Sequence, residues 1–435
     1  MATTNGPRTD KVAFVSTRIS GTDGVSLEIA KWAEVIERLG VTCYYIAGES
    51  DRPAERTHII EEAHFQHPRI REISRQAFSR ELRTPELTRE IVNMELAIRD
   101  KLYEAIERFG VEVIIVENAM TIPMNLPLGM ALVALVQEHG IGCVAHHHDF
   151  YWERERFLVS SVEDIIRYAF PPSLPQIQHV VINSLASEEF SRRTGLSCRI
   201  VPNVMDFANP PAPPDAYARR FRSEIGLRED DLLLLQPTRV VARKGIEHAI
   251  EIARRLAPRR AKLVITHASG DEGDAYAQRI REYSEMLGVD VLFADKWIAD
   301  QRGEASDGRK LFTIQDVYPQ ADLVTYPSTY EGFGNAFLEA VFCKCPIVCN
   351  RYAIYRTDIE PCGLRPILFD GFPTDDTVAE IERVLTDAVY RTQMVEHNYA
   401  TARQFFSYEV VEDELQLMIR RPQNIYRLVG RGRRR

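Results

Sequence analysis

The sequence predicts an α/β protein made of two Rossmann-like halves joined by a short linker. Both halves open in the same way. A short apolar run, at residues 11–16 and again at residues 232–236, is followed by a loop containing glycine and then by apolar residues at helical spacing. Short buried strands that alternate with helices are typical of parallel sheets. Residues 209–215 separate the halves, because four prolines in seven residues cannot enter the interior of a sheet or a helix.

The first half has a Rossmann-like opening of strand, glycine loop, helix and strand. Its helix runs from Ser26 and ends at Gly40, and residues 41–47 form the second strand. The fingerprint G-x-G-x-x-G is absent here, so bound NAD is not expected. Residues 51–110 are rich in charge and carry few strand signals. The remaining elements expected in this half are a helix over residues 91–109 and strands over residues 111–116, 142–145 and 180–182.

The second half repeats the alternation of strand and helix. After the strand at residues 232–236, residues 298–310 read as a polar loop without a clear motif. The helix that begins at Asn335 takes this residue as its N-cap. The other expected elements are strands over residues 261–266, 289–293, 321–326 and 346–349, and helices over residues 246–256, 378–389 and 408–419.

The composition is that of an ordinary globular enzyme. The 435 residues are 45% hydrophobic and 27% charged, and the formal net charge of −9 argues against a general nucleic-acid binder. No run of about 18 apolar residues exists, so no transmembrane segment is expected. The N-terminus lacks the apolar core of a signal peptide. We therefore expect a cytoplasmic protein, and the oligomeric state stays open.

The cysteines and the C-terminal tail carry weaker signals. Three of the seven cysteines, Cys343, Cys345 and Cys349, cluster at a spacing that does not match a zinc knuckle. We expect them to be small core residues in a reducing compartment. The basic tail at residues 421–435 is either a disordered terminus or a weak contact with anionic lipid.

One stretch indicates an anion site. An apolar strand at residues 321–326 leads into a turn with Gly332 and Gly334, and a helix follows at once. The unpaired N–H groups and the dipole of a helix N-terminus favour an anion there. Glycines let the backbone approach the ligand closely.

Two carboxylates flank this turn, at Glu331 and Glu339. A carboxylate can accept hydrogen bonds from two neighbouring hydroxyls, so such a pair suits a polyol on each side of a phosphate. A nucleotide sugar has this layout. The alternative is a solvated loop residue and an ordinary helical glutamate, since exposed glutamates are common.

The motif Glu331-Gly-Phe-Gly-x4-Glu339, which follows Ala-Asp-Leu-Val-x-x-Pro-Ser, resembles the paired-glutamate motif of retaining glycosyltransferases of family 4. The resemblance implies the GT-B architecture, with a nucleotide-sugar donor held mainly by the second domain. It implies that Glu331 contacts the donor sugar and Glu339 the ribose, with Gly332, Phe333, Gly334 and Asn335 beside the phosphates.

A second loop matches the same family, at Arg239-x4-Lys244-Gly245. The resemblance implies that Arg239 and Lys244 hold the donor diphosphate and stabilise its charge as it departs. Neither a metal nor another cofactor is then required. The side chain of the neighbouring Arg243 is expected to face solvent. In the first domain, Gly24 matches the glycine of the loop that closes over the donor, although a tight turn with no further role would explain it too.

The strand at residues 142–145 ends in three histidines followed by Asp149. Successive side chains of a strand alternate, so the three histidines cannot all face one metal, and no metal site is expected. The pair His148-Asp149 resembles the family's strand-end His-Asp, which implies a catalytic His148 near the donor sugar. Asp149 is then an acceptor ligand or orients an imidazole.

Arg154 and Arg156 follow directly, and two interpretations of them stay open. They could hold the carboxylate or phosphate of an anionic acceptor by bidentate contacts, or they could be salt-bridged residues at the start of a helix.

The family architecture fixes the expected domains. We expect a first domain over residues 1–206, to which a helix within residues 407–420 crosses back, a linker over residues 207–216 and a second domain over residues 217–406. The expected reaction moves a hexose, with retention, from a nucleoside-diphosphate sugar to a small hydroxylated acceptor.

Residues 16–28 and 146–152 are most similar to members of the family that act in mannosylglucosylglycerate synthesis. This similarity implies GDP-mannose as donor and the anionic glucosylglycerate as acceptor. Two alternatives are a UDP-glucose-dependent transferase of polysaccharide or glycolipid synthesis and a nucleotide-sugar binding protein without catalysis.

Overall fold

The computed structural model of the protein describes residues 9–21, 23–79, 82–269 and 274–419. The chain divides into two compact units. Unit 1 comprises the residues up to Pro202 together with those from Glu409 on, and unit 2 runs from Asn203 to Tyr408. The C-terminal helix α14 (Tyr408–Met418) therefore returns to the first unit, as expected of a GT-B fold. The basic tail at residues 421–435 lies outside the described residues.

Unit 1 is built on a seven-stranded sheet with the order β3-β2-β1-β4-β5-β6-β7. All its neighbouring strands are parallel. The central strands are buried along almost their whole length, as in sheets covered on both faces. The strands are β1 (Lys11–Ser16), β2 (Thr42–Ala47), β3 (Thr57–Ile59), β4 (Val113–Glu117), β5 (Gly142–His147), β6 (Ile177–Val181) and β7 (Arg199–Ile200).

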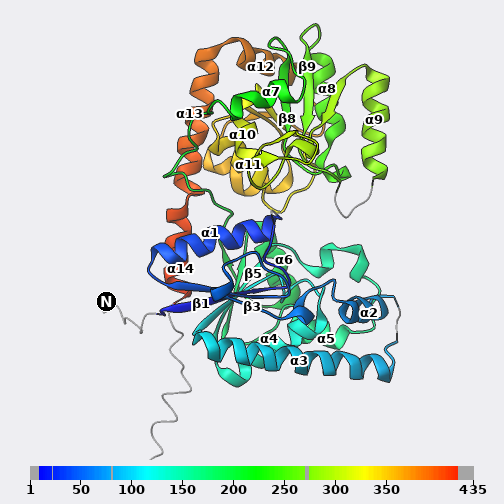
Figure 1. Cartoon of the computed structure of the whole chain (residues 1–435), viewed down its shortest axis with the longest axis vertical. Helices are drawn as coiled ribbons and strands as arrows, with labels where there is room; N and C mark the ends of the chain where they lie inside the picture. The colour runs from blue at the N-terminus through cyan, green and yellow to red at the C-terminus, as the bar shows by residue number, and fades with distance from the viewer. Residues whose placement is uncertain (1–8, 22, 80–81, 270–273, 420–435) are drawn as a thin grey trace, which may run out of the picture. The chain divides into compact units, whose positions relative to one another are not determined.

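Helices cover both faces of this sheet (Figure 1). One face packs against α3 and α4 in a core that includes Ile98, Leu132 and Ile114. On the other face, Trp32 of α1 stacks on the ring of His146 in β5, with ring centroids 4.1 Å apart. The helices are α1 (Gly24–Arg38), α2 (Pro68–Ala77), α3 (Pro85–Phe109), α4 (Leu126–His139), α5 (Glu163–Ala169), α6 (Ser184–Thr194) and α14.

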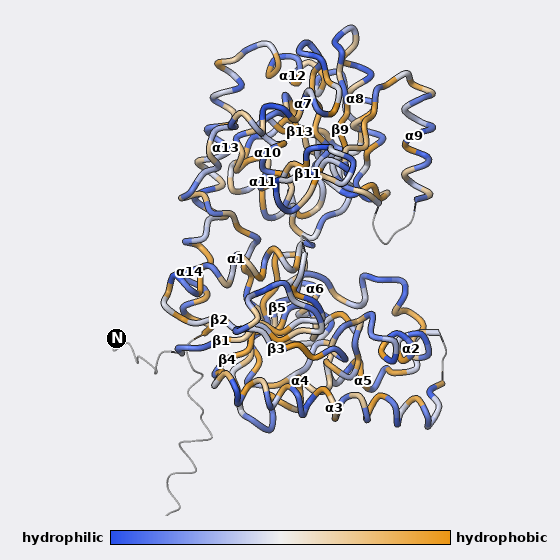
Figure 2. The backbone as a smooth tube through the Cα atoms, in the orientation of Figure 1, coloured by the Kyte–Doolittle hydropathy of each residue, from blue (hydrophilic) through white to orange (hydrophobic). Residues whose placement is uncertain are grey.

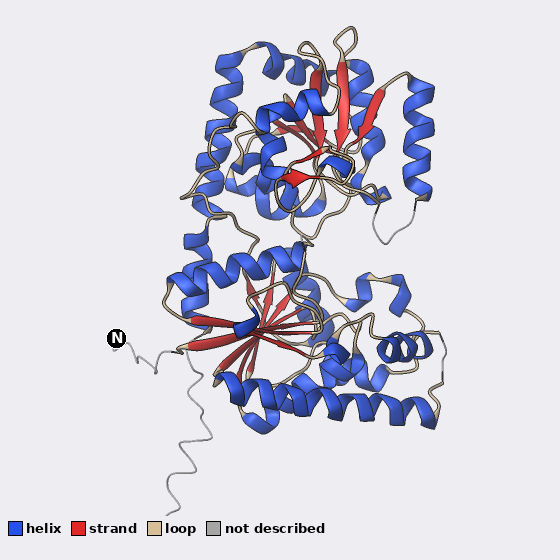
Figure 3. Cartoon of the chain, in the orientation of Figure 1, coloured by secondary structure: helices blue, strands red, loops and turns tan. Residues whose placement is uncertain are grey.

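Unit 2 contains a second parallel sheet, of six strands in the order β10-β9-β8-β13-β14-β15. The sheet strands again form the hydrophobic centre of their unit (Figures 2 and 3). A small antiparallel hairpin pairs β11 with β12. The strands are β8 (Leu232–Gln236), β9 (Ala261–Ile265), β10 (Asp290–Phe293), β11 (Gly303–Glu304), β12 (Lys310–Leu311), β13 (Leu323–Tyr326), β14 (Ile347–Asn350) and β15 (Ile367–Phe369).

The helices of unit 2 bury one apolar face each. Ile250 of α8, Ile280 of α9 and Ile381 of α12 belong to one core cluster that also contains Leu263 of β9. The helices are α7 (Phe221–Glu224), α8 (Ile246–Arg255), α9 (Ala275–Leu287), α10 (Ile314–Val317), α11 (Asn335–Phe342), α12 (Asp375–Thr386) and α13 (Ala388–Phe405).

The predicted strands of both sheets are confirmed to within a few residues. Three short strands, β3, β7 and β15, were not predicted, because two or three residues cannot display a periodic pattern. Three details were wrong. The single helix expected over residues 378–389 is the end of α12 and the start of α13, which are separated at Asp387. The polar loop at residues 298–310 contains β11, and Gly334, not Asn335, is the N-cap of α11.

The membrane and cysteine expectations can be checked on the described residues. None of their helices is long and apolar enough to cross a membrane. All seven cysteines are free. Cys345 and Cys349 are buried in unit 2, as expected for small core residues, and burial raises the pKa of the Cys345 thiol to about 12.

Candidate functional site

The two matched loops of unit 2 emerge side by side from its sheet. Strand β8 pairs with β9 on one side and with β13 on the other. The strands before β13 are therefore added towards one edge of the sheet and those from β13 on towards the other edge, and the switch point lies between β8 and β13. Ligands of open parallel sheets bind beyond the carboxyl ends of the strands at such a switch point. The loop after β8 carries Arg239 and Lys244, and the loop after β13 carries Glu331.

Lys244 and Glu331 contact each other across this point. The ammonium group of Lys244 donates a hydrogen bond to Glu331 Oε1, and both side chains are buried. Burial lowers the pKa of Lys244, and the charge of Glu331 opposes that effect. Arg243 was expected to face solvent, but its Nη1 lies 3.5 Å from Glu331 Oε2. Glu331 is thus held between two cations.

Close backbone packing fixes the two loops against each other. The N–H group of Thr329 donates to the carbonyl oxygen of Arg243 over 2.9 Å. Gly245 has a φ of +59°, and a Cβ atom there would lie only 2.5 Å from the carbonyl oxygen of Pro327. The glycine of the Lys244-Gly245 pair is therefore required by both its backbone conformation and the space around it.

Helix α11 points its N-terminus into the same loop region. The N-cap residue of this helix is Gly334, which provides no side-chain cap to the first N–H groups. Gly334 has a φ of +127°, and a Cβ atom there would lie 2.5 Å from the hydroxyl of Tyr352, which donates to Phe333 O over 2.7 Å. The side chain of Asn335 is used elsewhere, since its Oδ1 accepts a 2.6 Å hydrogen bond from Asn203.

The other predicted donor residues differ in their surroundings. Glu339 is half-buried, and its Oε2 accepts a 2.8 Å hydrogen bond from the buried hydroxyl of Tyr318. Phe333 is buried against Phe406, so only its backbone can face a ligand. Arg239 is exposed, and its positive charge helps to lower the pKa of Lys244, which places it within electrostatic range.

Unit 1 has its own switch point, between β1 and β4. Gly24 lies beyond the end of β1 as the first residue of α1, and it is exposed. The carboxylate of Asp23 caps this helix by accepting from the N–H groups of Val25 and Ser26. The loop after β1 thus ends in a capped helix N-terminus.

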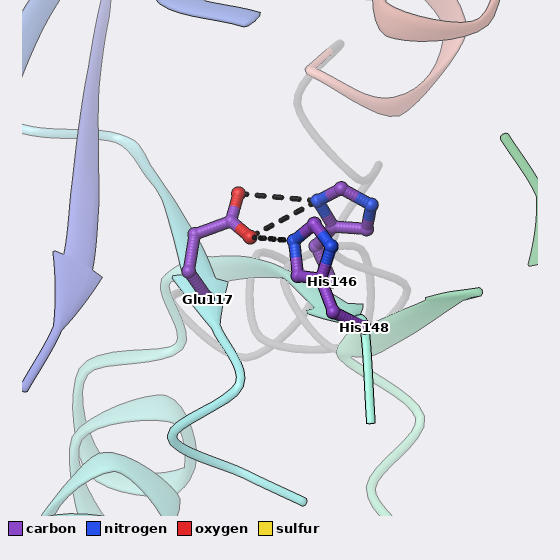
Figure 4. Close-up of side chains that lie close together, drawn as sticks. All are labelled: Glu117, His146 and His148. Atoms are coloured by element: carbon purple, nitrogen blue, oxygen red, sulfur yellow. Dashed lines mark hydrogen bonds and ion pairs between the residues drawn. The ribbon is translucent and has the colours of Figure 1, made fainter. Parts of the chain in front are cut away.

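A carboxylate and two imidazoles meet beside this switch point (Figure 4). Glu117 at the end of β4 lies 3.0 Å from His146 Nδ1 and 3.0 Å from His148 Nε2. The intervening His147 points the other way and forms a 2.9 Å hydrogen bond with His179. The alternation predicted for the three histidines is confirmed.

The charges of this cluster are strongly coupled. Burial alone would raise the pKa of Glu117, but the two histidines outweigh it and lower that pKa to about 2. Burial also opposes the charged form of His148, yet its hydrogen bond to Glu117 and the charge of that carboxylate raise the pKa of His148. Burial dominates for His146 and lowers its pKa. Glu117 therefore favours a protonated His148.

Asn118 holds the backbone of the same histidine. Its Oδ1 accepts a 2.8 Å hydrogen bond from the N–H group of His148. Asn118 has a φ of +57°, which is uncommon for a residue other than glycine and is typical of functional sites. The pair Glu117-Asn118 thus fixes His148 through both ring and backbone.

The cluster also has the composition of a metal site. Ligand atoms of Glu117, His146 and His148 all lie within 4.8 Å of one another, and they form the one such group among the described residues. Two imidazoles and a carboxylate are suitable ligands for Zn²⁺ or Fe²⁺. In the structure the carboxylate is already satisfied by hydrogen bonds to both rings. The expected absence of a metal stays a prediction.

The predicted acceptor residues fall into two groups. Asp149 and Arg154 pair with each other, with Oδ2 and Nη2 2.7 Å apart. Arg156 lies in the short helix η4 (Glu155–Phe157) and lines a cavity of about 590 Å³. The salt-bridge alternative describes Arg154, and Arg156 lines a concave surface.

Sequence reasoning missed the contacts of Glu117 and the cavity beside helix α2. The side chains that face Glu117 are 29 and 31 positions away in the chain. Helix α2 brings Arg71 and Arg75 to the cavity of Arg156. The proline at its first position was the available signal.

Comparisons with known proteins identify the family of the chain. The model of the family described as glycosyl transferases group 1 matches residues 233–387. The chain is 32% identical to a mannosylglucosylglycerate synthase of Thermotoga maritima, over 93% of this chain and 98% of the relative. It is 30% identical to a mannosylglucosylglycerate synthase of Petrotoga mobilis, over 82% of this chain and 86% of that relative.

Solved structures share the fold at low sequence identity. The structure of WaaG, a glycosyltransferase involved in lipopolysaccharide biosynthesis, matches with a TM-score of 0.59 and 15% identity, over 94% of this chain and 99% of that chain. Anabaena Alr3699/HepE in complex with UDP-glucose matches with a TM-score of 0.61 and 13% identity, over the same shares. The chain therefore belongs to the glycosyl transferases group 1 family, and it is a glycosyltransferase with the GT-B fold.

Proposed function

We propose that the protein transfers mannose, with retention, from GDP-mannose to glucosylglycerate or a similar small anionic acceptor. The observation that carries this proposal is the contact between Lys244 and Glu331, which joins the two matched loops at the switch point of unit 2. The names of the two full-length relatives support the choice of substrates.

In this proposal the diphosphate of the donor binds to cationic and N–H groups of unit 2. Arg239 and Lys244 supply positive charge, and the uncapped N-terminus of α11 supplies N–H donors near Gly332 and Gly334. Glu331 accepts hydrogen bonds from hydroxyls of the transferred sugar, and the two cations beside it hold its carboxylate in place. Glu339 lies one turn along α11 from Asn335 and accepts hydrogen bonds from the ribose hydroxyls. The hydroxyl of Tyr318 orients its carboxylate by donating a hydrogen bond to Oε2.

The residues of unit 1 serve the transferred sugar and the acceptor. His148, whose pKa is raised by its hydrogen bond to Glu117, faces the sugar, and Gly24 lets the loop after β1 approach the donor. No carboxylate is assigned as a covalent nucleophile. The acceptor oxygen bonds to the anomeric carbon on the face from which the diphosphate leaves, and the acceptor proton passes to an oxygen of that leaving phosphate.

Two further assignments complete the proposal. The acceptor lies near Asp149, Arg154 and Arg156, of which Arg156 lines a cavity. The protein works in a reducing, cytoplasmic compartment, which its seven free cysteines support. The alternative donor, UDP-glucose, remains as a second candidate to be tested beside GDP-mannose, and so does glycolipid synthesis.

The deciding experiment compares both donors with glucosylglycerate as acceptor and assigns the anomeric configuration of the product by NMR. Transfer from GDP-mannose with retained configuration is the expected result. Lys244→Met and Glu331→Gln should each lower turnover by about a hundredfold or more, since each removes a charged group from the cradle of the leaving group. Lys262→Met, at the amino end of β9, is the control. Unchanged turnover in the first two variants contradicts the proposal.

A further inference from the structure

Helix α1 buries a glutamate on the side that packs against the sheet of unit 1. Glu28 is only 1% exposed, and it lies in one row with Trp32 and Ile36, which are buried as well. Residues four positions apart lie on the same face of a helix. Burial of a carboxylate is costly unless it is paired and hydrogen-bonded, so packing alone does not explain a glutamate in this row.

One oxygen of this carboxylate has a partner and the other does not. Glu28 Oε1 accepts a 2.6 Å hydrogen bond from the ammonium group of Lys31, three positions further along the helix. Glu28 Oε2 is buried, and it has no hydrogen-bond partner among the residues that the structure describes. An ionised carboxylate only accepts hydrogen bonds, about four in all, so Oε2 is an acceptor that a ligand can use.

Glu28 lies beside the strand-end histidines. Trp32, one turn further along α1, stacks on the ring of His146 with centroids 4.1 Å apart and ring planes 18° apart. Because α1 begins beyond the carboxyl end of β1, residue 28 lies nearer to that edge of the sheet than residue 32, and His148 follows β5 at the same edge. Burial lowers the pKa of His148, whereas Glu117 and then the charge of Glu28 raise it, which places Glu28 within electrostatic range.

Neighbouring loops hold this part of α1 in place. Asp23 caps the helix, and Arg52 in the loop after β2 donates to the carbonyl oxygen of Ser26 over 3.0 Å. The loops after β1 and β2 are also joined, since the N–H group of Ile19 donates to the carbonyl oxygen of Glu49 over 2.8 Å. A carboxylate on a helix fixed in this way loses little freedom when a ligand binds.

The surroundings of Glu28 favour a neutral hydroxyl group as the ligand. His146 Nε2 is likewise buried without a hydrogen-bond partner in the described part of the chain, and Nδ1 of that ring lies 3.0 Å from Glu117. We assign the proton of the neutral ring to Nδ1, because the carboxylate can only accept, and Nε2 is then a second acceptor. Two acceptors and a negative charge repel an anion and suit the hydroxyl groups of a sugar, which donate.

We propose that Glu28 is a substrate-binding residue of unit 1, and that its Oε2 accepts a hydrogen bond from a sugar hydroxyl, directly or through one ordered water. Lys31 orients the carboxylate through Oε1. This inference rests on the proposed function and deepens it, because it adds a carboxylate to the part of unit 1 that serves the transferred sugar and the acceptor. The hydroxyl belongs to the hexose of the donor or to the acceptor, and both offer the same chemistry.

The test compares the wild type with Glu28→Gln, which keeps the shape of the side chain and removes its charge. Calorimetry measures the Kd of GDP-mannose and of UDP-glucose without acceptor, and the Kd of glucosylglycerate with GDP present. The loss of a hydrogen bond to a charged group should raise one of these values about tenfold to a hundredfold. A change for the nucleotide sugar identifies the hexose as the ligand, and a change for glucosylglycerate identifies the acceptor. The Kd of GDP, which lacks the hexose, should stay unchanged.

Monodeoxy derivatives of the affected ligand separate a direct contact from a structural role. The derivative that lacks the bound hydroxyl should bind equally well to the wild type and to Glu28→Gln, because the interaction is already absent from both complexes. The other derivatives should still bind more weakly to the variant. A carboxylate that only supports the fold would weaken the binding of every derivative by the same factor.

Glu34→Gln is the matched control. Glu34 lies in the same helix and pairs with Arg38 at 2.6 Å on the surface, so its substitution should change none of these Kd values. Unchanged Kd values for both kinds of ligand in Glu28→Gln overturn the inference, and so does an equal loss with every deoxy derivative. A wild type that binds neither kind of ligand also overturns it. A failure of the proposed function differs, because it shows as absent transfer from GDP-mannose, while the binding measurements still decide the role of Glu28.

Discussion

At the scale of single residues, the pKa of His148 depends on the charge of its neighbour Glu117. His148 was predicted as the strand-end histidine, and the structure adds that Glu117 raises the pKa of its ring. The carboxylate is fully buried and lies 3.0 Å from Nε2 of that ring. A buried ion pair of this kind raises the pKa of the imidazole and lowers that of the carboxyl.

The substitution Glu117→Gln removes this charge and should lower the pKa of His148. The raised pKa of the wild type means that the stabilising ion pair is fully present below pH 6.5 and is lost as the pH rises through the pKa of His148 in the folded state. In the variant, the free energy of unfolding should no longer fall as the pH rises through this range. The measurement is an NMR titration of ¹⁵N-labelled histidines, together with denaturation at several pH values.

Glu138→Gln is the control for this prediction. Glu138 lies in α4 and pairs with Arg99 at 3.2 Å on the surface. Its removal should leave the pKa of His148 unchanged. A wild-type pKa in the variant Glu117→Gln would show that the carboxylate does not govern the histidine.

At the scale of elements, the loop between β13 and α11 depends on a glycine. Gly334→Ala places a Cβ atom 2.5 Å from the hydroxyl of Tyr352 at a φ of +127°. We expect a stability loss of about 1–3 kcal/mol and weaker GDP binding, because the N-terminus of α11 must move. Denaturant unfolding and calorimetry measure these two effects.

Gly363→Ala separates backbone strain from crowding. Gly363 has a φ of +95°, but a Cβ atom there meets nothing within 4 Å. This variant should lose only about 1 kcal/mol and should bind GDP normally. Equal GDP affinity in Gly334→Ala and Gly363→Ala would refute a role of the α11 N-terminus.

At the scale of the whole molecule, ligand binding should raise the melting temperature by mass action. GDP should raise the Tm more than UDP or ADP at equal concentration, if the donor is GDP-mannose. A selective rise with UDP would replace the proposed donor by a UDP-sugar. Lys244→Met should abolish most of the rise, whereas Lys262→Met should keep it.

Chelation tests the expectation that catalysis needs no metal. Dialysis against EDTA should leave transfer and Tm unchanged, because Arg239 and Lys244 supply the charge that a metal would otherwise provide. Loss of activity that Zn²⁺ or Mn²⁺ restores in the wild type, but not in His146→Phe, would identify Glu117, His146 and His148 as metal ligands.

The alternation of strands and helices and the donor motifs can be recognised without a structure. Apolar runs such as residues 232–236 must be buried on both faces, which requires a parallel sheet covered by helices. Glycine in the Lys244-Gly245 and Glu331-Gly-Phe-Gly motifs also follows from local chemistry, because the positions that need a positive φ or a close approach exclude other residues.

Which side chains meet became known from the three-dimensional fold. Lys244 and Glu331 are separated by 87 positions, and Glu117 and His148 by 31. Arg71 and Arg156 line one cavity, although they belong to segments that follow different strands. Such pairs depend on strand order and on the direction of each loop, which arise from long-range packing, whereas periodicity and motif spacing report only on near neighbours in the chain.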